Sequence, residues 1–396
     1  GGSAAVLLFL LIGTGLLLKF VYEPVPAQAY QSILYLQNEV PFGQLLRNMH
    51  RWSGNGLMLV TLLHLLRVFY TAAYLPPRAP IWLIGLALFG VVIFSNFTGY
   101  LLPWDQIAYW AVTVSTSMLD YIPLVGTGLR NIVLGGAEPG QPTLMNFYAL
   151  HTAILPAALV IALSFHFWRI RKANGLVIPR GPQEQVPRPV QEVDAMPHLV
   201  TREVTLALIV FAVVLLISMS FDAPLADQAN PGLSPNPTKA PWYFMGFQEL
   251  LMHFHPVIAV LAIPSLLLAM LIAIPFVDAE SGGAGVWFRS RKGRVTAFVA
   301  CVVSAIATIC AVLLDERYTR TGEPGWLSML NGGWVTFGLL LTMCTVFYLL
   351  MKKIFSMSRS ESIQALFTLL LTGFVLLTAI GVWFRGPGMQ LTWTGF

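Results

Sequence analysis

Long apolar stretches alternate with short polar connections along the whole chain. Each stretch has about the 20 residues that an α-helix needs to cross a bilayer. The stretches cover residues 3–22, 50–72, 80–102, 149–170, 203–221, 256–277, 294–314, 332–352 and 362–384. This pattern predicts an all-α polytopic membrane protein with nine transmembrane helices.

The polar connections divide these helices into units. We expect a four-helix unit over 1–175, a proline-rich cytoplasmic linker over 176–202 and a second unit of four helices over 203–355. An extra helix and a tail follow over 356–396. The connections 103–148 and 222–255 are long for a compact bundle, and loops of that length are commonly functional.

Four histidines interrupt two of the apolar stretches at similar intervals. His50 precedes His64 by 14 positions, and His151 precedes His166 by 15. At about 1.5 Å and 100° per residue, a 14-residue step climbs about 21 Å and returns within about 40° of the same helix face. Two such helices side by side would offer two stacked pairs of imidazoles, and a b-type haem needs one imidazole on each side of its iron. The alternative is four unrelated histidines that line a polar cavity.

Glycines repeat with the same period in two other stretches. Gly1 and Gly15 are 14 positions apart, as are Gly85 and Gly99. Glycine leaves a helix surface flat, which suits the wall of a slot for a macrocycle. Ordinary close packing of helices in lipid is the alternative explanation for these glycines. With the histidines, they predict a four-helix bundle that binds two haems.

Composition supports a membrane protein and excludes a nucleic-acid partner. Hydrophobic residues make up 56% of the chain, charged residues make up 10%, and the mean hydropathy is +0.71. Most of the 23 lysines and arginines flank alternate connections, which predicts that those connections face the cytoplasm, the negative (n) side of a bacterial inner membrane. The three cysteines lie in apolar stretches without a CxxCH motif, so we expect no c-type haem in this chain.

Several short motifs resemble the cytochrome b family of quinol-oxidising bc complexes. The resemblance is close over about 1–175, where it is similar to the chloroplast and cyanobacterial plastoquinol-oxidising type, and looser over 195–355. The motifs are His50-Arg51-Trp52, His64-Leu65-Leu66-Arg67, Thr98-Gly99-Tyr100-Leu101-Leu102-Pro103-Trp104-Asp105-Gln106, Phe147-Tyr148-Ala149-Leu150-His151 and Ile170-Arg171-Lys172.

The resemblance implies two bis-histidine b haems. His50 and His151 would hold the haem on the positive (p) side, and His64 and His166 the haem on the n side. Three arginines lie within a turn of a ligand, where a guanidinium can pair with haem propionates. They are Arg47, Arg51 and Arg67, and snorkelling to the membrane interface is their alternative role.

The resemblance also implies two quinone sites. Quinol would be oxidised on the p side, between the end of the third apolar stretch and the 222–255 connection. The residues expected there are Trp104, Asp105, Gln106, Tyr109, Pro241, Trp242 and Tyr243. Quinone would be reduced on the n side beside Arg171, Lys172 and His198, although His198 is also explained as a plain surface histidine.

The chain departs from the family pattern at several places. The family's Pro-Glu-Trp-Tyr motif, whose Glu takes a proton from quinol, reads Ala240-Pro241-Trp242-Tyr243 here. We expect Glu249 to replace the missing glutamate as proton acceptor, and His253 and Asp105 are weaker candidates for that role. The alternative is that Glu249 caps or solubilises a surface helix. The family usually has an arginine five residues before the p-side ligand, and this chain has Asn146 at that position. The last apolar stretch is a ninth helix after the family's eight. The sequence leaves open whether a further haem binds on the n side near Gly1.

The expected function is a subunit of a quinol–cytochrome c oxidoreductase in a respiratory chain. Electrons from quinol would cross the membrane through the two b haems to an n-side quinone. Because the chain has no iron–sulfur motif, a Rieske-type iron–sulfur protein and a c-type cytochrome are expected as separate subunits, in a homodimer of complexes. The alternatives are a dihaem anchor that serves a non-Rieske multihaem protein and, from another class, a transporter with proton-relaying histidines.

Overall fold

The computed structural model describes residues 1–179, 181, 194–278, 284–320 and 334–392. Within these residues the chain is helical, with loops and two isolated bridges, Asp105 to Gln228 and Arg385 to Leu391. Residues 180 and 182–193 of the expected linker lie outside the described residues. The predicted all-α fold is confirmed.

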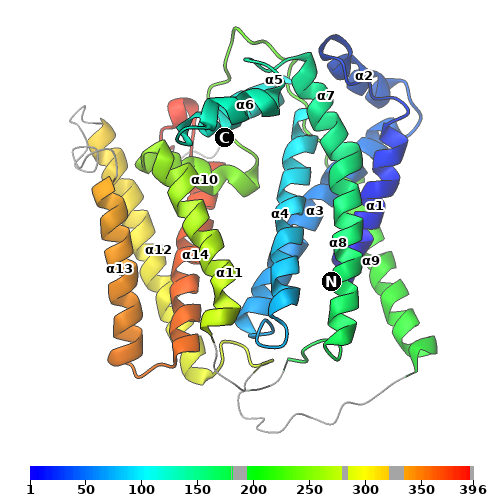
Figure 1. Cartoon of the computed structure of the whole chain (residues 1–396). Helices are drawn as coiled ribbons and strands as arrows, with labels where there is room; N and C mark the ends of the chain where they lie inside the picture. The colour runs from blue at the N-terminus through cyan, green and yellow to red at the C-terminus, as the bar shows by residue number, and fades with distance from the viewer. Residues whose placement is uncertain (180, 182–193, 279–283, 321–333, 393–396) are drawn as a thin grey trace.

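The N-terminal helices stand side by side (Figure 1). They are α1 (Gly2–Leu18), α3 (Gly43–Tyr70), α4 (Ala79–Leu101), the long helix formed by α7 (Gln141–Ala149), a π turn (Leu150–Ile154) and α8 (Leu155–Lys172), and then α9 (Val200–Ser220). The π turn accommodates Pro156, which cannot donate to the helical ladder. It also contains His151, so the candidate ligand lies where the helix is irregular.

The C-terminal helices form a second group (Figure 1). They are a π turn (Val257–Ala262) that leads into α11 (Ile263–Val277), then α12 (Arg291–Arg320), α13 (Trp334–Lys353) and α14 (Arg359–Trp383). Each of the nine predicted stretches therefore corresponds to a helix, although residues 19–22 of the first lie beyond the end of α1. Six helices of the described chain are long and apolar enough to cross a membrane. The protein is an integral membrane protein.

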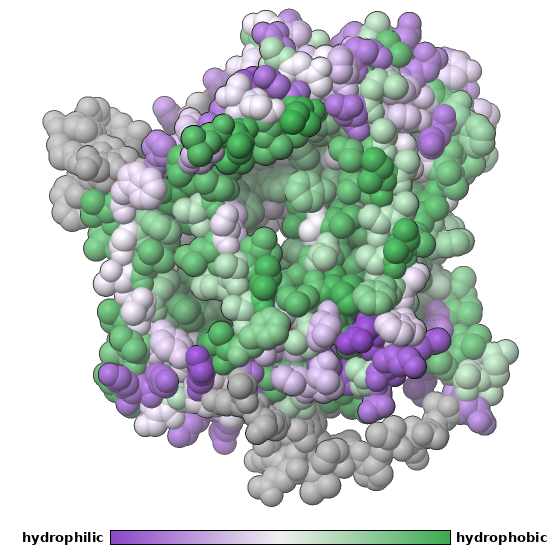
Figure 2. Space-filling model, in the orientation of Figure 1, coloured by the Kyte–Doolittle hydropathy of each residue, from purple (hydrophilic) through white to green (hydrophobic). Residues whose placement is uncertain are grey.

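Short helices cover one end of the bundle, which is the upper end in Figure 1. They are α2 (Pro26–Asn38), α5 (Gln106–Ser117), α6 (Gly126–Leu134) and α10 (Trp242–His253). We call this the upper end and the opposite one the lower end. Figure 2 shows an apolar belt between polar upper and lower margins. Large apolar side chains such as Phe94, Ile161 and Phe298 are 62% to 70% exposed, as expected for a surface that faces lipid.

The ninth helix, α14, is packed inside the C-terminal group. It contacts both α10 and α12, and its N-terminus is capped by Ser358, whose hydroxyl accepts from the Glu361 amide while the Glu361 carboxylate accepts from the Ser358 amide. Gly373 lies against Ser304 and Thr308 of α12. The helix that the sequence presents as an addition is thus part of the interior of this group.

Candidate functional site

The upper histidine pair faces across the N-terminal bundle. The ring centroids of His50 and His151 are 6.1 Å apart. Imidazoles on opposite sides of one metal ion have centroids about 6 Å apart, because each nitrogen lies roughly 2 Å from the metal. His151 Nδ1 lies 2.9 Å from the Ser95 carbonyl oxygen, and His50 Nδ1 lies 2.9 Å from the Thr14 hydroxyl. Such bonds orient a metal-binding ring and leave Nε2 for the metal.

Three of the four periodic glycines lie against candidate ligands. A Cβ at Gly99 would be 2.4 Å from His151 Cε1, and one at Gly15 would be 3.2 Å from His50 Cε1. A Cβ at Gly85 would be 3.6 Å from His166 Cε1, which is ordinary contact. Gly1 meets nothing within 4 Å and lines the lower cavity instead. The glycines therefore make room for the imidazole rings.

The lower histidine pair lines a large cavity. His64 and His166 share a cavity of about 1010 Å³ with Gly1, Gly85 and Arg67. Small-molecule sites typically have volumes of roughly 300–1,000 Å³, so this one lies at the upper limit. His166 is buried, and its Nδ1 has no hydrogen-bond partner within the described chain. A macrocycle with an imidazole ligand would fit this largely apolar space.

Basic residues surround the same cavity. Arg67 donates to the Val177 carbonyl (2.6 Å), and Arg171 is among the lining residues. Arg78, which the sequence analysis missed, also lines it and donates to the carbonyls of Ala173 and Gly175. The sequence could have indicated Arg78 as a candidate, because it lies just before an apolar stretch. Lys172 and His198 are exposed and do not line the cavity.

The two other arginines lie near the upper pair but have partners of their own. Arg47 is buried and donates to the carbonyls of Ala223 (2.6 Å) and Pro224 (2.7 Å), so it ties α3 to the 222–241 loop. The Arg51 guanidinium lies over the Tyr100 ring, 5.0 Å from its centroid. Within the described residues Arg51 donates to no carbonyl, so of the two arginines it is the one whose guanidinium is available to a polar ligand.

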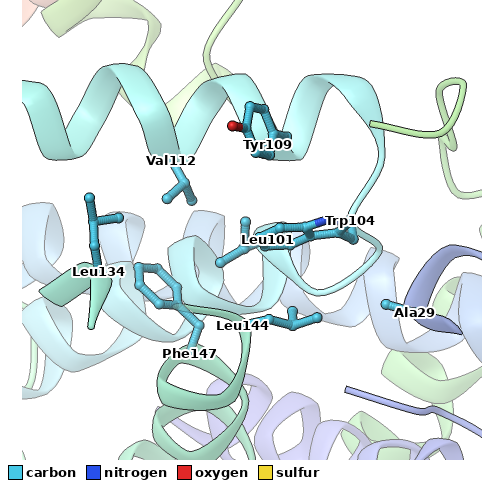
Figure 3. Close-up of a cluster of buried hydrophobic side chains, with 8 residues drawn as sticks. All are labelled: Ala29, Leu101, Trp104, Tyr109, Val112, Leu134, Leu144 and Phe147. Carbon is cyan, nitrogen blue, oxygen red and sulfur yellow. The ribbon is translucent and has the colours of Figure 1, made fainter. Parts of the chain in front are cut away.

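Trp104 and Tyr109 are packing residues. Both belong to a buried cluster around Leu101 and Phe147, which Figure 3 shows between α5 and the end of α7. Their rings meet edge to face, with centroids 5.7 Å apart. Such pairs contribute roughly 0.5–1.5 kcal/mol beyond area burial. The structure thus gives both residues a role in holding α5 at the upper end.

Asp105 and Gln106 hold the 222–241 loop. Asp105 caps α5 by accepting from the Ala108 amide, and its other oxygen accepts from Ala226 (2.9 Å). Gln106 accepts from the Asn230 amide and donates to the Leu233 carbonyl. Burial raises the pKa of Asp105. The amides of Ala226 and Ala108 and the nearby arginines oppose that shift. Both side chains fix where the loop begins its path towards α10.

The start of α10 lies against the four-helix unit. Pro241 caps the helix, Trp242 Nε1 donates to Asn55 Oδ1 (3.0 Å), and both Trp242 and Tyr243 pack on the apolar cluster of α1, α3 and α4. The buried Tyr243 hydroxyl has no hydrogen-bond partner within the described residues. Burial raises the pKa of Tyr243. Its hydroxyl is available to a polar ligand.

Glu249 has a different environment from the one expected. It is fully buried, and Arg385 donates to both of its carboxylate oxygens. Burial alone would raise the pKa of Glu249, but His253 and Arg385 hold it below its ordinary value. A general base works best when its pKa lies near the working pH. The burial of Glu249 contradicts the alternative that it caps or solubilises a surface helix, whereas its role as the acceptor of a proton from quinol stays a prediction.

Comparisons with known proteins agree with this arrangement. The family model described as cytochrome b/b6/petB matches residues 1–174. Cytochrome b6 of Acaryochloris marina is 39% identical over 172 residues, which are 43% of this chain and 80% of the relative. Cytochrome b6 of Prochlorothrix hollandica is 40% identical over 172 residues, which are 43% of this chain and 78% of the relative.

The chain belongs to the cytochrome b/b6 family. A chain of a solved "Hyperthermophilic respiratory Complex III" matches with a TM-score of 0.67 and 25% identity, over 96% of this chain and 89% of that chain. The likeness of this cytochrome b family member thus continues beyond the b6-like region into the C-terminal helices. Membership implies b-type haem, quinone binding and a redox electron-transfer role.

Proposed function

We propose that the chain is the dihaem cytochrome b subunit of a bc complex and works by a Q-cycle. The observation that supports this most is the upper pair, where His50 and His151 face each other at 6.1 Å and both Nδ1 atoms have partners that orient the rings. The two rings would hold one haem. His64 and His166, which line the lower cavity, would hold the second.

The chain's own residues would bind and orient the reactants. When bound, the haems accept and pass on single electrons. Arg51 would pair with a propionate of the upper haem, and Arg67 and Arg78 with those of the lower one. The Tyr243 hydroxyl would bind a quinol oxygen, while Asp105 and Gln106 keep the loop in place beside it. Arg171 lines the lower cavity, where it would contact the quinone that is reduced.

The upper end would face the p side of a bacterial inner membrane. The positive residues of the loops support this orientation. A Rieske-type iron–sulfur protein and a c-type cytochrome would take electrons there, in a homodimer of complexes. The alternative, a dihaem anchor for a non-Rieske multihaem partner, is favoured by the missing motif glutamate at Pro241.

Purification of the native complex tests this function. We expect two b haems per chain with the low-spin signature of bis-histidine ligation, quinol-dependent reduction of both, and an iron–sulfur subunit. One haem or none would contradict the proposal. Two haems with a multihaem subunit instead would support the alternative.

A topology reporter tests the orientation. We expect a reporter fused after Phe396 to be active only in the periplasm, and one fused in the 176–202 linker only in the cytoplasm. The opposite pattern would place the upper end on the n side.

A further inference from the structure

A buried charge cluster lies outside the haem and quinone sites. Its members come from α10, from the end of α12 and from the segment after α14, all at the upper end. They are Glu249, His253, Asp315, Glu316 and Arg385. Nothing in the proposed electron path uses these residues, so the cluster needs another explanation.

Arg385 is the centre of this cluster. Its Nε lies 2.9 Å and 3.2 Å from the two Glu249 oxygens, and its Nη2 also donates to Glu249. Its Nη1 donates to Glu316 (2.9 Å) and to the Met389 carbonyl (2.9 Å). Arg385 is 3% exposed and Glu249 is 0% exposed. A two-nitrogen contact of this kind fixes orientation as well as distance.

The segment that contains Arg385 is itself anchored. Gly386 donates to the Gln390 carbonyl, which closes a tight turn after α14. The Gly388 amide donates to Asn236 Oδ1 (2.6 Å), and the Lys239 ammonium donates to the Val382 carbonyl (3.1 Å). The turn therefore contacts the loop before α10 as well as α10 itself.

Close helix packing leaves α10 little freedom on α14. A Cβ at Gly246 would be 2.7 Å from the Thr378 hydroxyl, and one at Gly381 would be 2.4 Å from the Met245 side chain. The two helices approach each other closely at these two glycines. The Arg385–Glu249 pair adds a polar contact that would be lost if α10 rotated. Its loss would be costly, because the buried carboxylate would then have no charged partner.

We propose that Arg385 is a positioning residue for quinol oxidation: through Glu249 it fixes α10, and so holds Trp242 and Tyr243 against the four-helix unit. The inference rests on the proposed function. It also gives the ninth helix a role, since α14 provides the surface on which α10 is seated.

The surroundings of the pair favour the charged form of both side chains. His253 and Arg385 hold the pKa of Glu249 below its ordinary value despite its burial. Burial lowers the pKa of Arg385, but Glu249 and Glu316 raise it overall. A positioning role therefore predicts that losing the pair leaves the pH profile of quinol oxidation unchanged.

Steady-state kinetics of the native complex test the proposal. In Arg385→Gln we expect the KM for quinol to rise at least fivefold, while kcat changes less than twofold and both haem spectra stay intact. Arg385→Lys, which keeps the charge, should recover most of the affinity. The matched control is Arg130→Gln, which removes an exposed pair with Asp120 (3.0 Å) and should leave KM unchanged.

A neutral double variant covers the case in which Arg385→Gln fails to fold. Glu249→Gln with Arg385→Gln removes both charges of the central pair, while Glu316 keeps the Leu391 amide as a partner and His253 keeps Asp315. The KM of this double variant should still be raised. An unchanged KM in a folded variant would overturn the positioning role. A fall in kcat with a shifted pH profile would also overturn it, because Glu249 would then act in proton transfer. A wild-type complex that binds two haems but does not oxidise quinol would contradict the proposed function instead.

Discussion

The two histidine pairs are built differently although their spacing in the sequence is nearly the same. At the upper pair, Thr14 and Ser95 bind the ring nitrogens, and Gly99 lies tightly against His151. At the lower pair, His166 Nδ1 has no partner within the described residues, and the rings line a cavity of about 1010 Å³. Under the proposed function, the upper pair would be preorganised for one haem, whereas the lower cavity would take a haem and a second ligand.

The largest expected difference between the pairs concerns the glycines. Gly99→Ala should abolish the upper haem or lower its occupancy at least tenfold, because the new Cβ would lie 2.4 Å from His151. Gly85→Ala, with a Cβ 3.6 Å from His166, should keep both haems. A redox titration that resolves the two haems measures this. Equal effects of the two substitutions would contradict the difference in packing.

A smaller effect is expected from the hydroxyl beside the upper ligand. Thr14→Val keeps the shape but removes the contact to His50 Nδ1. Loss of such a partner typically weakens metal binding 10- to 100-fold. We expect the upper haem to dissociate faster in haem-transfer assays while the lower one is unaffected. If both haems respond alike, the contact does not distinguish the two sites.

The smallest expected effect concerns pH and the upper end alone. Burial lowers the pKa of His253, but Asp315 and Glu249 raise it overall to about 9. The resulting stabilisation is complete below the ordinary pKa of about 6.5 and disappears as pH rises through 9. Thermal unfolding should therefore show lower stability at pH 10 than at pH 7, and His253→Gln should flatten this dependence. A mutant with an unaltered slope would refute this origin.

Much of this fold follows from the sequence, because a spanning helix needs little more than 20 apolar residues. Helical periodicity puts His50 and His64 near one face of their helix. The sequence therefore also predicts that each of them faces one histidine of the other helix, and His50 does face His151. The Asp105 cap is a local signal of the same kind. Glu249 and Arg385, in contrast, are 136 positions apart and no periodicity connects them. Their pairing depends on how α14 packs against α10, which a pattern of apolar residues cannot specify.

If each histidine pair holds a haem of its own, His64→Ala should remove the lower haem alone. The variant complex should keep one b haem, with the redox and spectral properties of the upper site, and lose the other. Haem content and a redox titration of the purified complex, compared with wild type, give the answer. Two retained haems, or the loss of both from a folded complex, would contradict the assignment.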